Sequence, residues 1–232
     1  MQTSIVPLVS VVIPAFNEES NIAGIIAQTE ASMKTLNLPY EVIVINDGSN
    51  DSTKDKASGN GATVISYSTN RGKGYAIRRG LAKAQGQILV TIDADGSHNP
   101  AEIPLLVKPL LYGADVVIGS RFLRNNGKQI TSKLNTIGNK LINALILLLT
   151  RKKITDSQTG FRAFKRRAIN GIGLFSNGYE IESELTIKTI KNGFKVQEEH
   201  ITCDTRKSGH SKLNPLRDGF AILKTILKST VI

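Results

Sequence analysis

The chain has 232 residues, of which 40% are hydrophobic and 21% charged, the composition of an ordinary globular protein with a core. Its single cysteine, Cys203, excludes an internal disulfide and a zinc cluster built on cysteines. We find no signal peptide at the start and no run of about 18 apolar residues, so we expect no membrane-spanning helix.

The net charge of +11 is unevenly distributed along the chain. Residues 1–116 contain 9 Lys and Arg against 11 Asp and Glu, whereas residues 117–232 contain 21 against 8. A nearly neutral first half followed by a strongly basic second half indicates two surfaces with different partners. Nucleic acid and anionic membranes are the usual partners of a basic surface.

In the first half, short apolar runs alternate with helical patterns. Strands are expected over residues 9–13, 41–46, 62–66, 87–93 and 115–119, and Pro14 is expected to end the first of them. Helices are expected over residues 22–33, 75–85 and about 100–112. This alternation predicts βαβ units and an α/β fold with a doubly wound, mostly parallel sheet that has helices on both faces.

The second half is richer in helix. We expect helices over residues 133–150 and 179–192, a polar turn over 156–162 and a strand over 194–202. The last helix, 216–232, has apolar residues on one face and basic residues elsewhere. We therefore divide the chain into a catalytic domain, 1–213, and an amphipathic, basic C-terminal helix, 214–232. Within the domain, a nucleotide-binding half covers about 8–120 and an acceptor-binding half about 121–213.

The stretch from Gln87 to Pro100 is the one around which a site would be organised, although Asp-x-Asp alone is a weak motif and two solvated loop aspartates are the alternative. A buried strand ends there in Asp93 and Asp95, and ligands bind at the carboxyl ends of strands in open α/β sheets. One carboxylate can take a hard cation such as Mg²⁺, which needs few protein ligands when phosphate and water supply the others. His98 in the same loop lacks metal-ligand spacing and is expected to be a polar loop residue.

Six motifs occur in a characteristic order. They are Val11-Val12-Ile13-Pro14-Ala15-Phe16-Asn17-Glu18-Glu19, Asn46-Asp47-Gly48-Ser49, Asp93-Ala94-Asp95, Gly119-Ser120-Arg121, Asp156-Ser157-Gln158-Thr159-Gly160-Phe161-Arg162, and residues 206–212. Together they resemble the family 2 inverting glycosyltransferases with the GT-A fold, especially the synthases of dolichyl- and other polyprenyl-phosphate sugars. The resemblance covers residues 8–213 and implies metal-dependent sugar transfer from a nucleotide sugar to a lipid phosphate.

The resemblance also assigns roles to matching residues. The nucleotide contacts would be Pro14, Phe16, Glu18, Asp47, Ser49, Lys73 and Asp93. The divalent cation, Mg²⁺ or Mn²⁺, would lie on Asp95, with Asp93 and Ser97 as further ligands. The acceptor phosphate would lie against Arg121, Lys133, Arg206 and Lys212. The residues expected to carry catalysis are Asp95, Arg121, Asp156 and Arg206.

The chain departs from the family pattern in three places. Asn46 stands where many members carry a second aspartate, and Gly96-Ser97 replaces a bulky residue and often a Gln, which leaves the remaining metal ligand open. The chain has no Trp, so it lacks the signature of processive polysaccharide synthases. We therefore expect single transfers and no chain extension.

The acceptor determines whether a catalytic base is needed. A phosphate monoester is mostly ionised at neutral pH, since its second pKa is about 6, so it needs cations and no base. Transfer to a saccharide or protein hydroxyl is the alternative, and it would require a base among Asp156, Glu180 or Glu182. We expect most of Glu180, Glu182 and Glu184 to face solvent, because a spacing of two spreads them around a helix.

Several further expectations follow for partners and location. GDP-mannose and UDP-hexoses both fit as donors, and the 156–162 motif leans toward UDP by resemblance. We expect a peripheral protein on the cytoplasmic face of a membrane. Residues 133–150 or the C-terminal helix would make the contact with the membrane. The alternative role for the apolar face of the C-terminal helix is a subunit contact in a homodimer. A nucleic-acid-binding module is a remote alternative, since only 5% of residues are aromatic and no RNP-like or zinc motif occurs.

Overall fold

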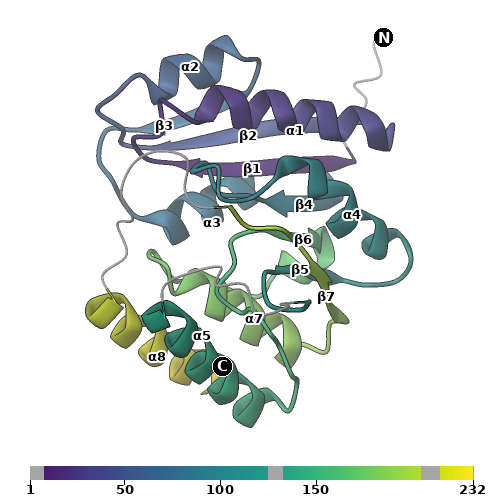
Figure 1. Ribbon diagram of the computed structural model, residues 1–232, viewed down its shortest axis with the longest axis vertical. Helices are drawn as coiled ribbons and strands as arrows, with labels where there is room; N and C mark the ends of the chain where they lie inside the picture. Colours follow the sequence, from purple (N-terminus) through teal and green to yellow (C-terminus); the bar gives the residue numbers. More distant parts are fainter. Residues whose placement is uncertain (1–7, 125–132, 205–214, 232) are drawn as a thin grey trace.

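A seven-stranded sheet forms the centre of the computed structural model, which describes residues 8–124, 133–204 and 215–231 (Figure 1). Its strands are β1 Val9–Ala15, β2 Tyr40–Asp47, β3 Thr63–Tyr67, β4 Ile88–Thr91, β5 Val116–Ser120, β6 Arg162–Lys165 and β7 Val196–His200. Their order in the sheet is β3-β2-β1-β4-β6-β5-β7. Six of them run in one direction, and β6 runs antiparallel to its neighbours β4 and β5. The expected mostly parallel α/β sheet is confirmed.

Helices cover both faces of this sheet. They are α1 Ile22–Leu36, α2 Thr53–Gly59, α3 Lys73–Lys83, α4 Ile103–Leu111, α5 Lys133–Thr150, α6 Arg166–Ile169, α7 Ile181–Lys191 and α8 Pro215–Val231, with a short 3-10 turn, η1 Pro100–Glu102. Apolar side chains of α1 and α4 pack against one face, and those of α3 and α7 pack against the other. Helices α5 and α8 lie side by side in a further layer against α7 (Figure 1).

The central strands are buried on both faces, which explains their continuous apolar sequences. Strand β1 extends to Ala15, two residues beyond its predicted end at Ile13. Its pairing with β4 stops at Val12, so the missing N–H of Pro14 lies outside that ladder.

Strand β6 was not predicted from the sequence. It has four residues, Arg162 to Lys165, and both of its ends are charged. A short run of this kind has no recognisable alternation, and it becomes a strand because β4 and β5 pair with it from both sides.

The C-terminal helix is present over nearly the expected residues. Helix α8 contributes Ile222 and Ile226 to a small apolar cluster with Ile146 of α5 and Ile187 of α7. The predicted domain boundary at 213–214 lies outside the described residues and stays a prediction. In the described part of the chain, every helix is too short or too polar to cross a bilayer.

Candidate active site

The sheet brings three of the predicted motifs to one edge. Strands β1, β2 and β4 are parallel neighbours, so their carboxyl ends lie side by side (Figure 1). The segments that leave these ends are residues 16–21, 48–52 and 92–99. Ligands of open α/β sheets bind at this edge, because the loops there surround a crevice.

The first two of these loops are tied together. The backbone N–H of Asn17 donates to Ser49 Oγ at 2.9 Å, and that of Glu18 donates to Thr53 Oγ1 at 2.8 Å. Asn17 has a φ of 56°, a conformation that Asn adopts more readily than most residues. The tie holds three predicted nucleotide contacts near one another: a half-buried Phe16, a buried Glu18 and Ser49. A fourth, Pro14, is the half-buried second-to-last residue of β1.

Asp47 ends β2 and is buried. Its two oxygens accept hydrogen bonds from the backbone N–H groups of Arg71 (2.9 Å) and Gly72 (2.8 Å). Gly72 has a φ of 99°, and a Cβ there would lie 2.4 Å from the carbonyl oxygen of Asn177, so the position requires glycine. Asp47 therefore fixes the turn from which α3 begins, and the first residue of α3 is Lys73.

Lys73 lies between two carboxylates. Its Nζ is 2.7 Å from Asp93 Oδ1 and 3.1 Å from Glu182 Oε1. Burial alone would lower the pKa of Lys73, but the two carboxylates outweigh burial and the pKa is raised. Burial alone would raise the pKa of Asp93, but Lys73 outweighs it and the pKa falls below its ordinary value. Lys73 and Asp93 therefore form a charged pair at neutral pH.

Asp95 lies half-buried two residues beyond Asp93. Its Oδ1 accepts hydrogen bonds from the backbone N–H of Ser97 at 3.0 Å and from the Ser97 hydroxyl at 2.6 Å. The turn thus sets a carboxylate beside a hydroxyl oxygen at the edge of the sheet.

These oxygens fit a hard cation that is shared with a ligand. Mg²⁺ and Mn²⁺ prefer oxygen donors, and at phosphate sites Mg²⁺ takes one or two protein carboxylates and completes its shell with phosphate and water. Asp95, with Ser97 beside it and Asp93 nearby, is such a donor set. In residues 8–124, 133–204 and 215–231, no cluster of three or more His, Cys, Asp or Glu side chains is arranged to hold a metal by itself.

His98 lies in a loop as expected, but its side chain is buried. Its Nε2 is 3.9 Å from Asp93 Oδ2, and its ring centroid is 5.5 Å from that of Phe161. Burial lowers the pKa of His98, so the imidazole is neutral at pH 7. The backbone of His98 also pairs with Cys203, and this bridge joins the loop after β4 to the segment after β7.

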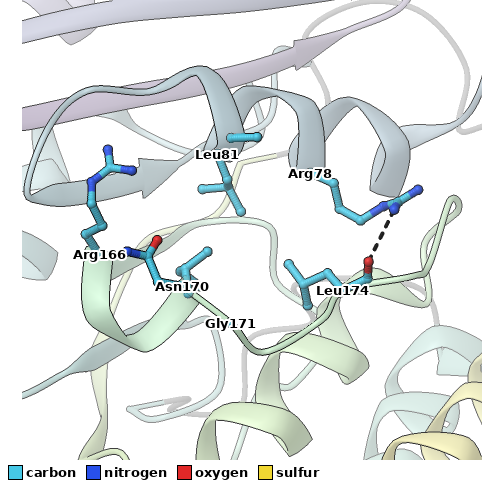
Figure 2. A pocket seen from close by; sticks show the side chains of 8 residues that line it. Arg78, Leu81, Arg166, Asn170, Gly171 and Leu174 are labelled. Carbon is cyan, nitrogen blue, oxygen red and sulfur yellow. Dashed lines mark hydrogen bonds between the residues drawn. The ribbon is translucent and has the colours of Figure 1, made fainter.

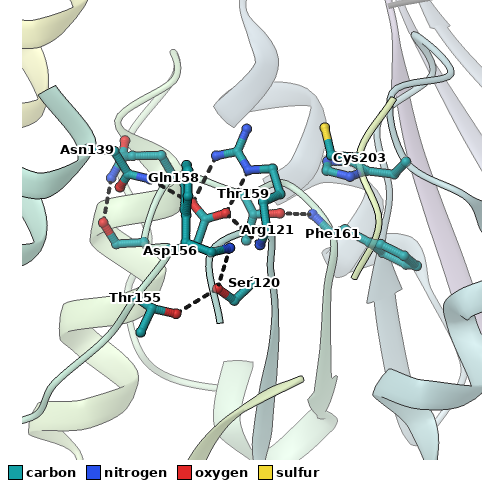
Figure 3. A network of polar contacts seen from close by, with 12 residues as sticks. Ser120, Arg121, Asn139, Thr155, Asp156, Gln158, Thr159, Phe161 and Cys203 are labelled. Atoms are coloured by element: carbon teal, nitrogen blue, oxygen red, sulfur yellow. Dashed lines mark hydrogen bonds and ion pairs between the residues drawn. The ribbon is translucent and has the colours of Figure 1, made fainter. Parts of the chain in front are cut away.

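Arg121 and Asp156 form the centre of a polar network (Figure 3). Arg121 donates from Nε to Asp156 Oδ2 at 2.6 Å and from Nη2 to Oδ1 at 2.9 Å, the fork geometry that suits carboxylates. The backbone N–H of Arg121 and the Nδ2 of Asn139 donate to the same carboxylate. Burial alone would lower the pKa of Arg121, but Asp156 outweighs it and the pKa is raised. Two predicted catalytic residues thus contact each other directly.

The expectation for the glutamates of α7 was wrong. Glu182 and Glu184 are buried, because α7 is covered by the sheet on one side and by α5 and α8 on another. Glu184 accepts from the backbone N–H groups of Phe175 and Ser176 and pairs with Lys188 at 2.9 Å. Helical spacing describes faces relative to one helix and cannot say how many of those faces are covered.

From the sequence, Glu182 was predicted only as a candidate base for the alternative acceptor, its pairing with Lys73 was missed, and no role was predicted for Arg162. Arg162 is fully buried, and its Nε lies 3.2 Å from Glu182 Oε2. The motif of residues 156–162 was the available signal for Arg162. No sequence pattern indicated that Glu182 would pair with Lys73.

A separate pocket of about 310 Å³ lies between α3 and the segment that follows α6 (Figure 2). It is lined by Arg78, Leu81, Ala82, Arg166, Ile169, Asn170, Gly171 and Leu174. Arg78 donates to the carbonyl oxygen of Leu174, and Arg166 donates to those of Ala84 and Gly86. None of the predicted site residues lines this pocket.

Three predicted acceptor-phosphate residues cannot be located in the described structure. Arg206 and Lys212 lie outside the described residues, as does His210. Lys133 begins α5, but its side chain is not among those described.

Comparison with known proteins gives relatives for most of the chain. It is 32% identical over 212 residues to a dolichol-phosphate mannosyltransferase of Pyrococcus furiosus, covering 88% of this chain and 59% of the relative. It is 35% identical over 170 residues to an undecaprenyl-phosphate 4-deoxy-4-formamido-L-arabinose transferase of Serratia proteamaculans, covering 71% and 51%. The chain therefore spans a little over half the length of these two relatives.

Among solved structures, the chain resembles glucosyl-3-phosphoglycerate synthase of Mycobacterium tuberculosis in complex with Mn²⁺, UDP-glucose and phosphoglyceric acid. The TM-score is 0.76 at 27% identity, covering 97% of this chain and 80% of the other. This likeness confirms the expected GT-A architecture. The profile of glycosyl transferase family 2 matches residues 10–173. The chain belongs to glycosyl transferase family 2 and is a glycosyltransferase.

Proposed function

We propose that the protein transfers a sugar, with inversion, from a nucleotide sugar to a polyprenyl phosphate. One observation carries this proposal: each carboxylate that could act as a base already accepts hydrogen bonds or lies in ion pairs. Asp156 accepts from Arg121 and Asn139, Glu180 accepts from the backbone N–H groups of residues 177 and 178, and Glu182 lies between Lys73 and Arg162. A phosphate acceptor needs no base, because it is already ionised.

The names of the relatives support the same acceptor class. Two of them are named for transfer to dolichol phosphate or undecaprenyl phosphate, and both align with most of this chain. Arg121 is the described candidate for holding such a phosphate, together with Lys133, Arg206 and Lys212.

The donor would lie at the carboxyl ends of β1, β2 and β4. Phe16, Glu18 and Ser49 would border the base and ribose from the two tied loops, and Asp47 would act through the turn that leads to Lys73. Lys73 and Asp93 would lie next to the diphosphate. GDP-mannose and UDP-hexoses remain the candidate donors, and the UDP-glucose in the solved relative favours the second.

A divalent cation, Mg²⁺ or Mn²⁺, would be held by Asp95 with Ser97 and Asp93 close by. When bound, it supplies positive charge that stabilises the departing diphosphate. The solved relative was crystallised with Mn²⁺, which supports the use of a divalent cation.

Contact with a membrane surface would come from α5 and α8. Their exposed large apolar side chains are Ile137, Leu141, Leu147, Leu148, Phe220, Leu223 and Leu227. Lys224 and Lys228 are exposed on α8, so the helix combines apolar and basic residues as interfacial helices do. Each basic residue near an anionic surface adds about 1 kcal/mol of attraction. We propose a peripheral protein on the cytoplasmic face, with a homodimer through these side chains as the rival.

The decisive experiment offers labelled GDP-mannose and UDP-hexoses to the protein with Mn²⁺ and a polyprenyl phosphate. The expected product is a sugar linked to the lipid phosphate, with the anomeric configuration inverted relative to the donor. A sugar transferred to saccharide hydroxyls and never to the lipid phosphate would refute the proposal in favour of the alternative acceptor. Retention of RNA or DNA without any turnover would refute both.

A further inference from the structure

Glu182 is the third member of a line of four side chains, alternately acidic and basic, that begins at the edge of the sheet. Asp93 pairs with Lys73, Lys73 with Glu182, and Glu182 with Arg162, at distances of 2.7, 3.1 and 3.2 Å. The exposed fraction of the side chain falls along the line, from 22% for Asp93 and 17% for Lys73 to 2% for Glu182 and 0% for Arg162. The four residues come from the end of β4, from α3, from α7 and from β6.

The inner end of this line is firmly anchored. Arg162 forms an ion pair with Glu182, and it donates hydrogen bonds to the carbonyl oxygens of Thr159 and Ser157 and to Thr186 Oγ1. A buried carboxylate beside a guanidinium held in this way has little freedom to move. The outer end differs, because Asp93 is partly exposed at the end of a strand, where a donor or its cation can draw it away.

The position of Lys73 is equally restricted. A Cβ on Gly160 would lie 2.6 Å from Asp93 Oδ2 and 2.6 Å from Lys73 Nζ, so the ion pair packs directly on the backbone of Gly160. The same turn continues to Arg162, which anchors Glu182. A lysine side chain has a flexible four-carbon stem, and with Asp93 as its single partner it would follow that carboxylate.

We infer that Glu182 is a positioning residue for donor binding: it holds the Lys73 ammonium at the strand-end edge while Asp93 engages the donor or its cation. The inference rests on the proposed function, in which Lys73 lies next to the diphosphate. It adds that a buried carboxylate with no contact to the donor phosphates sets the affinity for the nucleotide.

A double-mutant cycle tests this. The full chain and the variants Lys73→Met, Glu182→Gln and the double variant are titrated with UDP and with GDP in the presence of Mn²⁺, with calorimetry as the readout. Each single change is expected to weaken nucleotide binding about tenfold or more. The double variant is expected to bind no more weakly than Lys73→Met, because Glu182 acts only through Lys73.

Two further variants separate positioning from folding. Thr186→Val removes a partner of Arg162 without touching Lys73, and it is expected to leave nucleotide affinity within about twofold. Glu182→Asp keeps a carboxylate beside Arg162, but its shorter side chain holds Lys73 less well. This variant replaces Glu182→Gln in the test if Glu182→Gln does not fold. It is expected to raise the donor KM with a smaller change in kcat.

Additive losses in the double variant would overturn the inference and leave the proposed function standing. Unchanged nucleotide affinity in both Glu182→Gln and Glu182→Asp would do the same. If the unaltered chain bound neither UDP nor GDP, the proposed function would fail together with the inference.

Discussion

Asp156→Asn tests the network around Arg121 most directly. Asp156 is fully buried, and both of its oxygens accept hydrogen bonds from the guanidinium fork of Arg121 at 2.6 and 2.9 Å. Asparagine keeps the shape of the side chain but removes its charge. Its NH₂ group cannot accept the hydrogen bond that the carboxylate oxygen accepted at that position. Removing one partner of a buried pair costs about 3–5 kcal/mol, because the other charge is left without compensation.

The expected change is large enough to measure by two independent methods. For a chain of this size, each kcal/mol lowers Tm by roughly 2–4 °C, so Tm should fall by about 6–20 °C. Urea unfolding followed by circular dichroism should give the matching loss in the free energy of unfolding. Transfer activity should fall as well, because Arg121 loses the residue that orients it.

A pair in which only the arginine is exposed provides the control, because Asp115 keeps the hydrogen bond from the backbone N–H of Lys195 when the arginine is removed. Arg167 donates to Asp115 at 3.0 and 2.6 Å, but its side chain is 66% exposed. Arg167→Met should therefore cost no more than about 1 kcal/mol. If Asp156→Asn cost no more than Arg167→Met, the reasoning that burial makes the Asp156 pair important would be refuted.

Four further predictions follow from the site. Asp95→Asn, or a chelator added to the unaltered protein, should remove most turnover, and full activity in EDTA would rule out the metal assignment. Arg206→Lys should slow transfer to the lipid phosphate more than donor hydrolysis, since an ammonium cannot form the bidentate fork, and equal losses would move Arg206 to the donor side. Gly160→Ala should weaken nucleotide binding, measured by calorimetry, with little loss of Tm, because the new methyl group displaces only the ends of two side chains. Unchanged affinity would contradict the tight packing at Gly160. Truncation after Asn214 should lower sedimentation with anionic liposomes, and loss of a dimer with full liposome binding would favour the subunit contact.

Much of the sheet could be predicted because its strands are buried on both faces. The runs around Val9–Ile13 and Ile88–Thr91 are continuously apolar, and each ends abruptly in polar residues that mark the loop. Strand β6 lacked this signal, since two of its four residues are charged. It exists because β4 and β5 leave a gap of one strand between them, which is a property of the assembled sheet.

The sequence by itself was enough to predict that three motifs would meet at the ends of β1, β2 and β4, since the ends of parallel neighbours lie at one edge of the sheet. The family resemblance predicted that Arg121 and Asp156 act in one site, and the structure shows that the two side chains contact each other. Only the tertiary structure decided the partners of Lys73. Glu182 lies 109 positions after Lys73 in the sequence. The pattern of residues along its helix does not show which faces are buried. That carboxylate is buried because α5 and α8 cover α7, and it lies between Lys73 and Arg162 because the fold brings these two residues to it from two other elements.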